Sequence, residues 1–281
     1  MNKIIYTTGI TGFIGKNLLG HLLCEYGNVV NFTRQGTIQF INNQNTCEEN
    51  ISENFFIQHP PHCLINLATL YKQFPESSNE LSNLVESNIL FPSKVISVLK
   101  KFKDLKIINV LSYTQLLKLP EQNVYSLSKE LFKKYLDHHF NSVVNVYLFD
   151  TFGSGDTRNK VTDVFIKNIL AGQSIIIPSS EININLSECN QVSKSLLRSI
   201  NLDPGSYAIK SPYTISLETL ATLIMEILNT KVEIIKTNHA IDHLKTIQIF
   251  PENIFPIDDY LNLKKTLTKR IQEIKNEIEG N

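Results

Sequence analysis

The segment Gly9-Ile10-Thr11-Gly12-Phe13-Ile14-Gly15 constrains the fold of this chain more than any other feature. An extended run from Lys3 to Thr7 precedes it, and leucines at helical spacing follow it up to Gly27. A glycine turn between a strand and a helix lets the backbone approach a pyrophosphate closely, and the helix N-terminus favours the negative charge. This context predicts a dinucleotide site. The residues expected to bind the cofactor there are Gly9, Thr11, Gly12, Phe13, Ile14 and Gly15.

Short apolar runs alternate with segments of helical period through the first half of the chain. This pattern predicts an α/β fold of the Rossmann type, a doubly wound parallel sheet covered by helices on both faces. Strands are expected at 29–32, 38–41, 63–67, 107–111 and 143–149, and helices near 80–102, 126–140, 161–171, 190–200 and 216–228. Residues 42–62 are expected to form a loop with at most one short helix. An amphipathic helix is expected from Asp259 onward.

Beyond Phe149 the strand signals become short and irregular, with candidates at 174–178 and 206–209. We therefore predict a Rossmann domain over residues 1–155 and a smaller C-terminal α/β module over 156–281 that shapes the substrate site. The second module is expected to interleave with the first around residues 183–200.

The charge balance excludes several classes of protein. There are 27 basic and 27 acidic residues and the formal net charge is zero, which argues against a nucleic-acid or membrane-surface binder. No apolar run approaches the roughly 18 residues that span a bilayer. The four cysteines have no paired spacing, and the first residues run directly into a strand instead of a signal peptide. These features predict a soluble, cytoplasmic protein without nucleic-acid or membrane partners.

The end of the second predicted strand reads Phe32-Thr33-Arg34. Sites for NAD usually place a carboxylate there to bind the adenosine ribose, whereas an arginine suits the 2′-phosphate of NADPH. Arg34 therefore favours NADPH over NADH, although a solvated surface arginine is the alternative interpretation.

Tyr125 and Lys129 are four residues apart, so they share one face of the predicted helix. They follow a strand that ends in Ser112. A lysine ammonium near a phenol, together with an oxidised nicotinamide, is expected to lower the tyrosine pKa, as acid/base catalysis requires.

His59, His62 and Cys63 form a histidine-rich cluster, but no fourth ligand is suggested, so we expect no metal site.

Together, Gly9-x-x-Gly12-x-x-Gly15, the strand 64–68, Asn88, Ser112 and Tyr125-x-x-x-Lys129 resemble the extended short-chain dehydrogenase/reductase family, also called the NAD-dependent epimerase/dehydratase family. The resemblance implies a cofactor contact at Leu67 and Ala68, and dimers formed by the helices near 80–102 and 126–140. It also implies that a nucleoside-diphosphate sugar is the substrate, near Asn88 and Thr151. By the same resemblance, Ser112 binds the reacting oxygen, Tyr125 exchanges a proton, and Lys129 serves the tyrosine and the nicotinamide ribose.

Departures from the family pattern narrow the expected reaction. Only twelve residues separate Ser112 from Tyr125, which predicts an open site and leaves Thr114 as a rival for the hydroxyl role. Asn190-Gln191 stands in place of the usual acidic pair. Ser112 is followed by Tyr113-Thr114-Gln115, without the Asp-Glu pair of a 4,6-dehydratase or the cysteine of an epimerase-reductase.

Two reactions remain. The first is NADPH-dependent reduction of the C4 keto group of a nucleoside-diphosphate 4-keto-6-deoxyhexose, linked to CDP or dTDP, in deoxysugar biosynthesis. The second is a 4-epimerisation that keeps NAD bound. Arg34 favours the reductase.

Arg158 is a candidate for a diphosphate contact or, equally, for a surface ion pair. A non-catalytic NADPH-binding sensor or scaffold is a further alternative that shares this fold.

Overall fold

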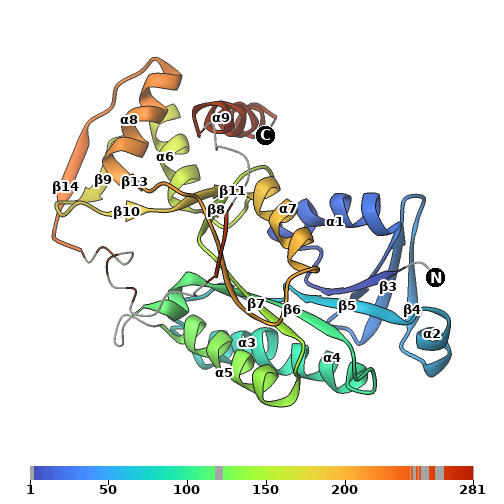
Figure 1. The fold of residues 1–281 in the computed structure, drawn as a ribbon. Coiled ribbons are helices and arrows are strands. Elements are labelled where there is room, and N and C mark those ends of the chain that lie inside the picture. Colours follow the sequence, from blue (N-terminus) through green and yellow to red (C-terminus); the bar gives the residue numbers. More distant parts are fainter. Residues whose placement is uncertain are drawn as a thin grey trace.

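A computed structural model describes residues 3–117, 123–240, 242, 245, 247, 253–256 and 263–280. Its main feature is a nine-stranded sheet in the order β15-β12-β7-β6-β5-β1-β2-β3-β4 (Figure 1). All pairings from β15 to β2 are parallel, and the β2–β3 and β3–β4 pairings are antiparallel. The strands are β1 (Ile4–Thr8), β2 (Asn28–Phe32), β3 (Thr37–Asn42), β4 (Thr46–Asn50), β5 (Pro61–Asn66), β6 (Lys106–Ser112), β7 (Val143–Leu148), β12 (Gly205–Lys210) and β15 (Asn253–Pro256).

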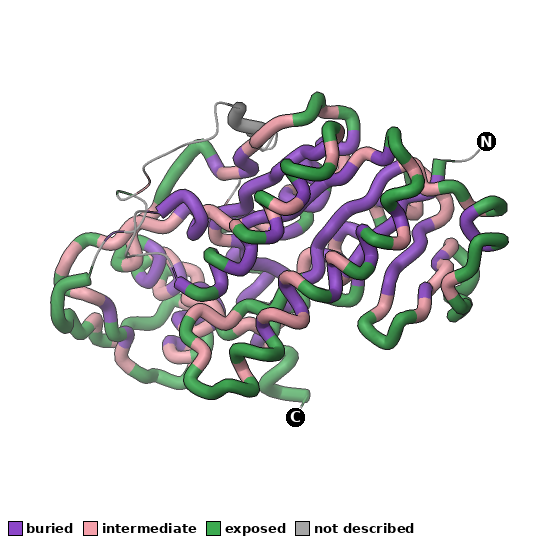
Figure 2. Tube along the Cα trace, turned by 90° about the horizontal axis from the view of Figure 1, so that it is seen from below, coloured by how far each residue is buried: buried purple, intermediate pink, exposed green. Residues whose placement is uncertain are grey.

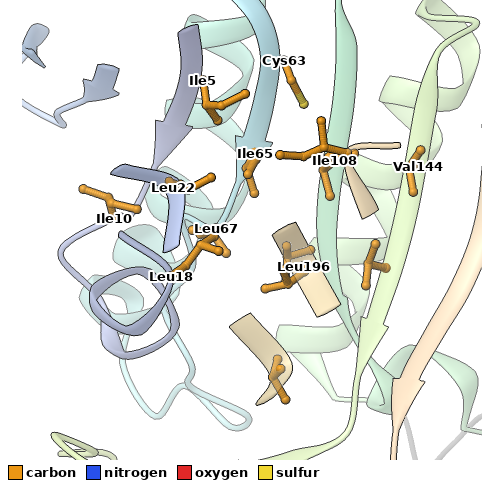
Figure 3. Packing of buried hydrophobic residues seen from close by; sticks show 14 of the residues in the cluster. Ile5, Ile10, Leu18, Leu22, Cys63, Ile65, Leu67, Ile108, Val144 and Leu196 are labelled. Carbon is orange, nitrogen blue, oxygen red and sulfur yellow. The ribbon is translucent and has the colours of Figure 1, made fainter. Parts of the chain in front are cut away.

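Helices cover both faces of this sheet, and its middle is largely buried (Figure 2), with every residue of β1 and β7 buried. On one face lie α1 (Phe13–Tyr26) and α7 (Cys189–Ser199), whose Leu18, Leu22 and Leu196 pack over the sheet (Figure 3). On the other face lie α4 (Phe91–Leu99) and α5 (Val124–His139), with α3 (Ser78–Val85) beside them and the short α2 (Glu53–Gln58) near β4. Alternating residues of β1 explain the two cores, because Ile5 joins the first and Ile4 and Tyr6 join the second. The doubly wound Rossmann fold expected from the sequence is confirmed.

A third core lies in the C-terminal half. It is built from α6 (Val161–Leu170), α8 (Leu217–Leu228) and α9 (Leu263–Glu279) against β9 (Ile175–Pro178), with Phe152 and Leu186 at its edge. Three small sheets accompany it: β8 (Asp150–Phe152) with β11 (Leu186–Glu188), β10 (Asn183–Ile184) with β13 (Ile215–Ser216), and β9 with β14 (Ile234–Thr237). The chain returns to the main sheet through α7, β12 and β15. The division at residue 155 stays a prediction.

Three local expectations differ from the structure. Residues 46–50 form β4 and not a loop, and β3 runs antiparallel to β2. Every residue of β4 is exposed and no apolar pattern marks it, and it pairs with β3 at the edge of the sheet. The helix expected at 80–102 contains a π-turn, η1 (Glu86–Leu90), between α3 and α4. Residues 118–122, within the short connection from Ser112 to Tyr125, and 257–262, at the start of the expected tail helix, lie outside the described residues.

A chain of buried amides crosses the parallel strands. Asn66 donates to Asn109 (3.1 Å), Asn109 donates to Asn145 (3.0 Å), and Asn145 donates to Asp137 of α5 (2.8 Å). Thr8 donates to Asn66 over 2.7 Å. These residues lie directly opposite one another in the sheet. A slipped register would leave buried amides unpaired. These hydrogen-bonded amides therefore specify the alignment of β1, β5, β6 and β7.

Within the described part of the chain, no helix has the length and apolar character needed to cross a membrane.

Candidate active site

A cleft of about 630 Å³ opens at the carboxyl ends of β1, β2 and β5. After α1 the chain forms β2 on one side of β1, and it later returns to form β5 on the other side, which makes this edge a topological switch point. The predicted cofactor residues Gly9, Thr11, Gly12, Phe13, Ile14, Gly15, Arg34, Leu67 and Ala68 all line the cleft, as does Tyr125. Lys129 lines the adjoining pocket instead.

The glycine loop has no room for side chains at two of its positions. Gly9 has a φ of +72°, and a Cβ there would lie 2.8 Å from the Ala68 nitrogen. A Cβ on Gly15 would lie 2.4 Å from the Gly9 carbonyl oxygen. Gly12 is the N-cap of α1 and no side chain caps the helix, so the first N–H groups are free to receive a ligand. These features fit a dinucleotide pyrophosphate.

The end of the cleft formed by β2, β3 and the turn between them is neutral or basic. Asn31, Thr33, Arg34, Gln35 and Gln39 line it, and no carboxylate is present among the described residues around the whole cleft. Asn31 is held in place, since it donates to Gln39 over 2.9 Å. This end therefore offers no acidic partner for the two ribose hydroxyls of NAD, and it offers the guanidinium of Arg34 to an anion.

A second pocket of about 130 Å³ adjoins the cleft, and Tyr125 lines both. Ser112, Tyr125 and Lys129, the three predicted catalytic residues, come together in its lining. Thr114 also lines it, but its backbone N–H and its hydroxyl both donate to the Ser112 hydroxyl oxygen, over 3.3 and 3.0 Å. Thr114 therefore orients Ser112 and leaves the Ser112 proton available to another acceptor.

Burial shifts the pKa values of Tyr125 and Lys129. It raises the pKa of Tyr125, although hydrogen bonds with Thr69 and Ser112 and the charge of Arg158 act in the opposite direction. It lowers the pKa of Lys129 to about 8. The Lys129 amine donates to the Val110 carbonyl oxygen over 2.8 Å. In the protein by itself desolvation dominates at the tyrosine, and the expectation that Lys129 and an oxidised nicotinamide together lower the Tyr125 pKa stays a prediction.

Asn88 supports the loop that follows β5. It lies on η1, and its side chain accepts from the backbone N–H of Leu70 (2.7 Å) and from the Thr69 hydroxyl (3.3 Å). It also donates to the Leu70 carbonyl (3.2 Å) and to the Ser128 hydroxyl (3.0 Å). Asn88 is not among the residues that line either pocket. Its contacts position Thr69, which lines both, and the substrate contact proposed for Asn88 stays a prediction.

Arg158 lies at the boundary between the two pockets and lines both. Its guanidinium donates to Asp156 through Nε and Nη2, each over 2.7 Å, and to the carbonyl and hydroxyl oxygens of Thr151, over 2.9 and 3.1 Å. Its central carbon lies 4.3 Å from the centre of the Phe13 ring in the glycine loop. The ion pair weighed for Arg158 is therefore present, and it lies inside the site. Thr151 lines the smaller pocket.

Sequence reasoning missed several residues of the smaller pocket, among them Tyr71, Asp150, Lys160 and Thr162. The Tyr71 ring makes an edge contact with Tyr125 at 5.0 Å, and the Lys160 amine lies 3.6 Å from the centre of the Tyr71 ring. Burial lowers the pKa of Lys160 to about 8 and raises that of Asp150. Thr162 Oγ1 is buried without a hydrogen-bond partner among the described residues. Lys160 stands two residues beyond Arg158, the one signal that could have indicated it.

Within the histidine cluster near residue 60, His59 packs against aromatic rings. The His59 ring lies 4.8 Å from that of Phe40 and 4.7 Å from that of Phe55. Among the residues that the structure describes, no group of three or more His, Cys, Asp or Glu side chains could hold a metal ion.

The chain has known relatives in sequence and in fold. The chain is 23% identical to a CDP-abequose synthase of Yersinia pseudotuberculosis, over 96% of this chain and 99% of the relative. Its fold is similar to a UDP-glucose 4-epimerase of Thermotoga maritima solved with UDP-glucose (TM-score 0.73, 16% identity, 98% and 99% coverage). It is also similar to RMD of Pseudomonas aeruginosa complexed with NADPH (TM-score 0.70, 15% identity, 99% coverage of both chains).

The family itself is identified by a sequence profile, described as the NAD dependent epimerase/dehydratase family, that matches residues 5–184. The matched residues include the glycine loop, Arg158 and the predicted catalytic residues Ser112, Tyr125 and Lys129. The chain therefore belongs to the NAD dependent epimerase/dehydratase family and is an enzyme of the NAD(P)-dependent oxidoreductase type, similar to those that act on nucleotide sugars.

Proposed function

We propose that this protein uses NADPH to reduce the C4 keto group of a nucleoside-diphosphate 4-keto-6-deoxyhexose linked to CDP or dTDP. The observation that carries the proposal is the continuity of two pockets. Ser112, Tyr125 and Lys129 line the smaller one, and Tyr125 also faces a cleft that ends in Arg34 without a carboxylate.

Tyr125 and Ser112 have complementary roles in the proposed reaction. Bound NADPH supplies the hydride that reduces the carbonyl carbon. Tyr125 gives its phenolic proton to the oxygen of that carbonyl as negative charge develops there, and its raised pKa keeps the phenol protonated at neutral pH. Ser112, oriented by Thr114, donates a hydrogen bond to the same oxygen. Lys129 holds the nicotinamide ribose.

The first turn of α6 is our candidate for the substrate diphosphate. The α6 N-terminus has no side-chain cap, so its N–H groups are available to an anion. Lys160, Val161 and Thr162 all line the smaller pocket, and the unpartnered Thr162 hydroxyl can donate. Arg158 and Thr151 lie beside them. Positive charge and unpaired donors together suit a diphosphate better than a neutral ligand.

The relative that spans nearly the whole chain supports a sugar linked to CDP. A solved neighbour that contains NADPH supports the choice of cofactor, although the fold alone is shared at that identity. The similarity to a UDP-glucose 4-epimerase favours the second candidate, an NAD-dependent nucleotide-sugar 4-epimerase.

The test mixes purified protein with NADPH or NADH and with CDP- or dTDP-4-keto-6-deoxyglucose, and follows the absorbance of reduced nicotinamide. Stoichiometric loss of NADPH, little loss of NADH, and loss of turnover in Tyr125→Phe with unchanged NADPH binding are expected. Conversion of a non-keto sugar nucleotide without added cofactor would refute the reductase in favour of the epimerase. Tight NADPH binding without turnover would favour a sensor.

We also propose a homodimer and a cytoplasmic location. Leu81 on α3, Leu90 on η1, and Leu127 and Leu131 on α5 are exposed apolar residues on neighbouring helices. Such a patch suits a second copy of the chain. Light scattering should give a dimer mass, and Leu131→Glu should give the monomer mass. The four cysteines are free thiols, as expected in a reducing compartment.

A further inference from the structure

Arg270 of α9 is buried but has no place in the proposed reaction. It is 2% exposed, and its guanidinium makes five hydrogen bonds. Two go to Asp163 of α6, over 2.6 and 3.1 Å, and two go to Glu273 and Glu277 on its own helix. Because a guanidinium has five N–H donors, one donor remains for the fifth bond.

The fifth bond reaches the active-site loop. Arg270 donates through Nη2 to the backbone carbonyl of Asp156 over 3.2 Å, across 114 residues of sequence. The Asp156 carboxylate is also buried, and it accepts from the Arg158 guanidinium twice and from the Arg158 backbone N–H (3.0 Å). Asp156 therefore links Arg270 to Arg158.

The loop that carries Asp156 needs such an anchor. Gly153, Gly155 and Asn159 all have positive φ angles, and the two glycines give the chain before Asp156 more conformational freedom than other residues would. A loop of this kind loses much entropy when it is ordered, and a bond to a helix of the C-terminal core offsets part of that loss.

We propose that Arg270 is a positioning residue of the active site, which acts through Asp156 to hold Arg158 between the cofactor cleft and the substrate pocket. The C-terminal helix α9 thereby contributes to ligand binding without touching the ligand. The inference rests on the proposed function for the identity of the ligands, but the contacts that carry it do not depend on the reaction.

The test needs a variant that folds. Arg270→Met alone would leave the Asp163 carboxylate buried and unpaired, so the substitution is combined with Asp163→Asn, which removes both charges. Asp163→Asn alone is the matched control, because it keeps Arg270 and its bond to the Asp156 carbonyl. Glu273→Gln is a second control, since Glu273 contacts Arg270 but not the loop. Circular dichroism and the melting temperature establish folding.

The measurement is a double-mutant cycle with Arg158→Met, read from the dissociation constants of NADPH, CDP and dTDP by titration calorimetry. In the natural background and in both controls, Arg158→Met should raise the dissociation constant of at least one of these ligands on the order of tenfold. In the Arg270→Met/Asp163→Asn background Arg158 is already displaced, so Arg158→Met should raise the dissociation constant of the same ligand less than about threefold.

Two results would overturn the proposal. If Arg270 served stability alone, the melting temperature would fall while Arg158→Met kept its tenfold effect in every background. If Arg158→Met changed the binding of none of the three ligands, Arg158 would have no binding role for Arg270 to support. Absence of turnover with intact NADPH binding would refute only the proposed reaction, because the cycle is read from binding.

Discussion

Lys129 is the residue whose replacement should separate stability from activity. Burial lowers its pKa from 10.5 to about 8, and each pKa unit corresponds to about 1.4 kcal/mol between the charged and neutral forms. At pH 7, the buried ammonium therefore destabilises the native state by about 3 kcal/mol. Lys129→Met removes this penalty and loses one hydrogen bond to Val110, worth about 1 kcal/mol. We expect the variant to be more stable by about 2 kcal/mol and inactive.

The pH dependence of the free energy of unfolding tests whether the buried charge of Lys129 causes this difference in stability. Between pH 8 and 10.5 the unfolded chain keeps a proton that native Lys129 has released, so the stability of the natural protein rises with pH in this window. The advantage of Lys129→Met should shrink by about 2 kcal/mol between pH 7 and 9.5, as measured by urea unfolding. Lys134→Met, at an exposed position of the same helix, should show no such change. A variant less stable at pH 7, or a difference that does not vary with pH, would refute this account.

Three further predictions concern the cofactor, the sheet and the substrate. Arg34→Ala should weaken NADPH binding about tenfold to a hundredfold and NADH binding hardly at all, as measured by titration, and equal losses would contradict a 2′-phosphate contact. Asn109→Ala should lower the free energy of unfolding by about 2–4 kcal/mol in urea, because Asn66 and Asn145 lose buried partners, and a change under about 1 kcal/mol would show that the amide chain is not stabilising. The KM for the keto sugar should rise as the pH passes through about 8 and Lys160 loses its charge, and this dependence should disappear in Lys160→Gln. A pH-independent KM in the natural protein would exclude a charge contact by Lys160.

Local patterns were sufficient to predict the parts of the site that are contiguous in sequence. The glycine loop, Arg34 and the Tyr125-x-x-x-Lys129 pair each depend on a strand end or on one helical turn, so short-range periodicity locates them. The same holds for the buried strands. It fails for β4, whose five residues are all exposed and which exists because β3 pairs with it. It also fails at η1, because Pro92, two residues beyond η1, indicates a kink or break in the helix but not that it takes the form of a π-turn.

The sequence by itself therefore determined the fold class, and it located the glycine loop and the Tyr125–Lys129 pair, because each of these follows from residues within a few positions of one another. Their cofactor-binding and catalytic roles stay predictions. Tertiary structure alone decided which distant groups share the site. Tyr71, Asp150 and Lys160 line the same pocket as Tyr125, because the β5–α3 connection, strand β8 and the β8–α6 connection converge there. Only packing brings Arg270 to Asp156 across 114 residues. Tertiary structure also decided the sign of the Tyr125 pKa shift, since desolvation depends on the neighbours that folding assembles and not on the spacing of Tyr125 and Lys129.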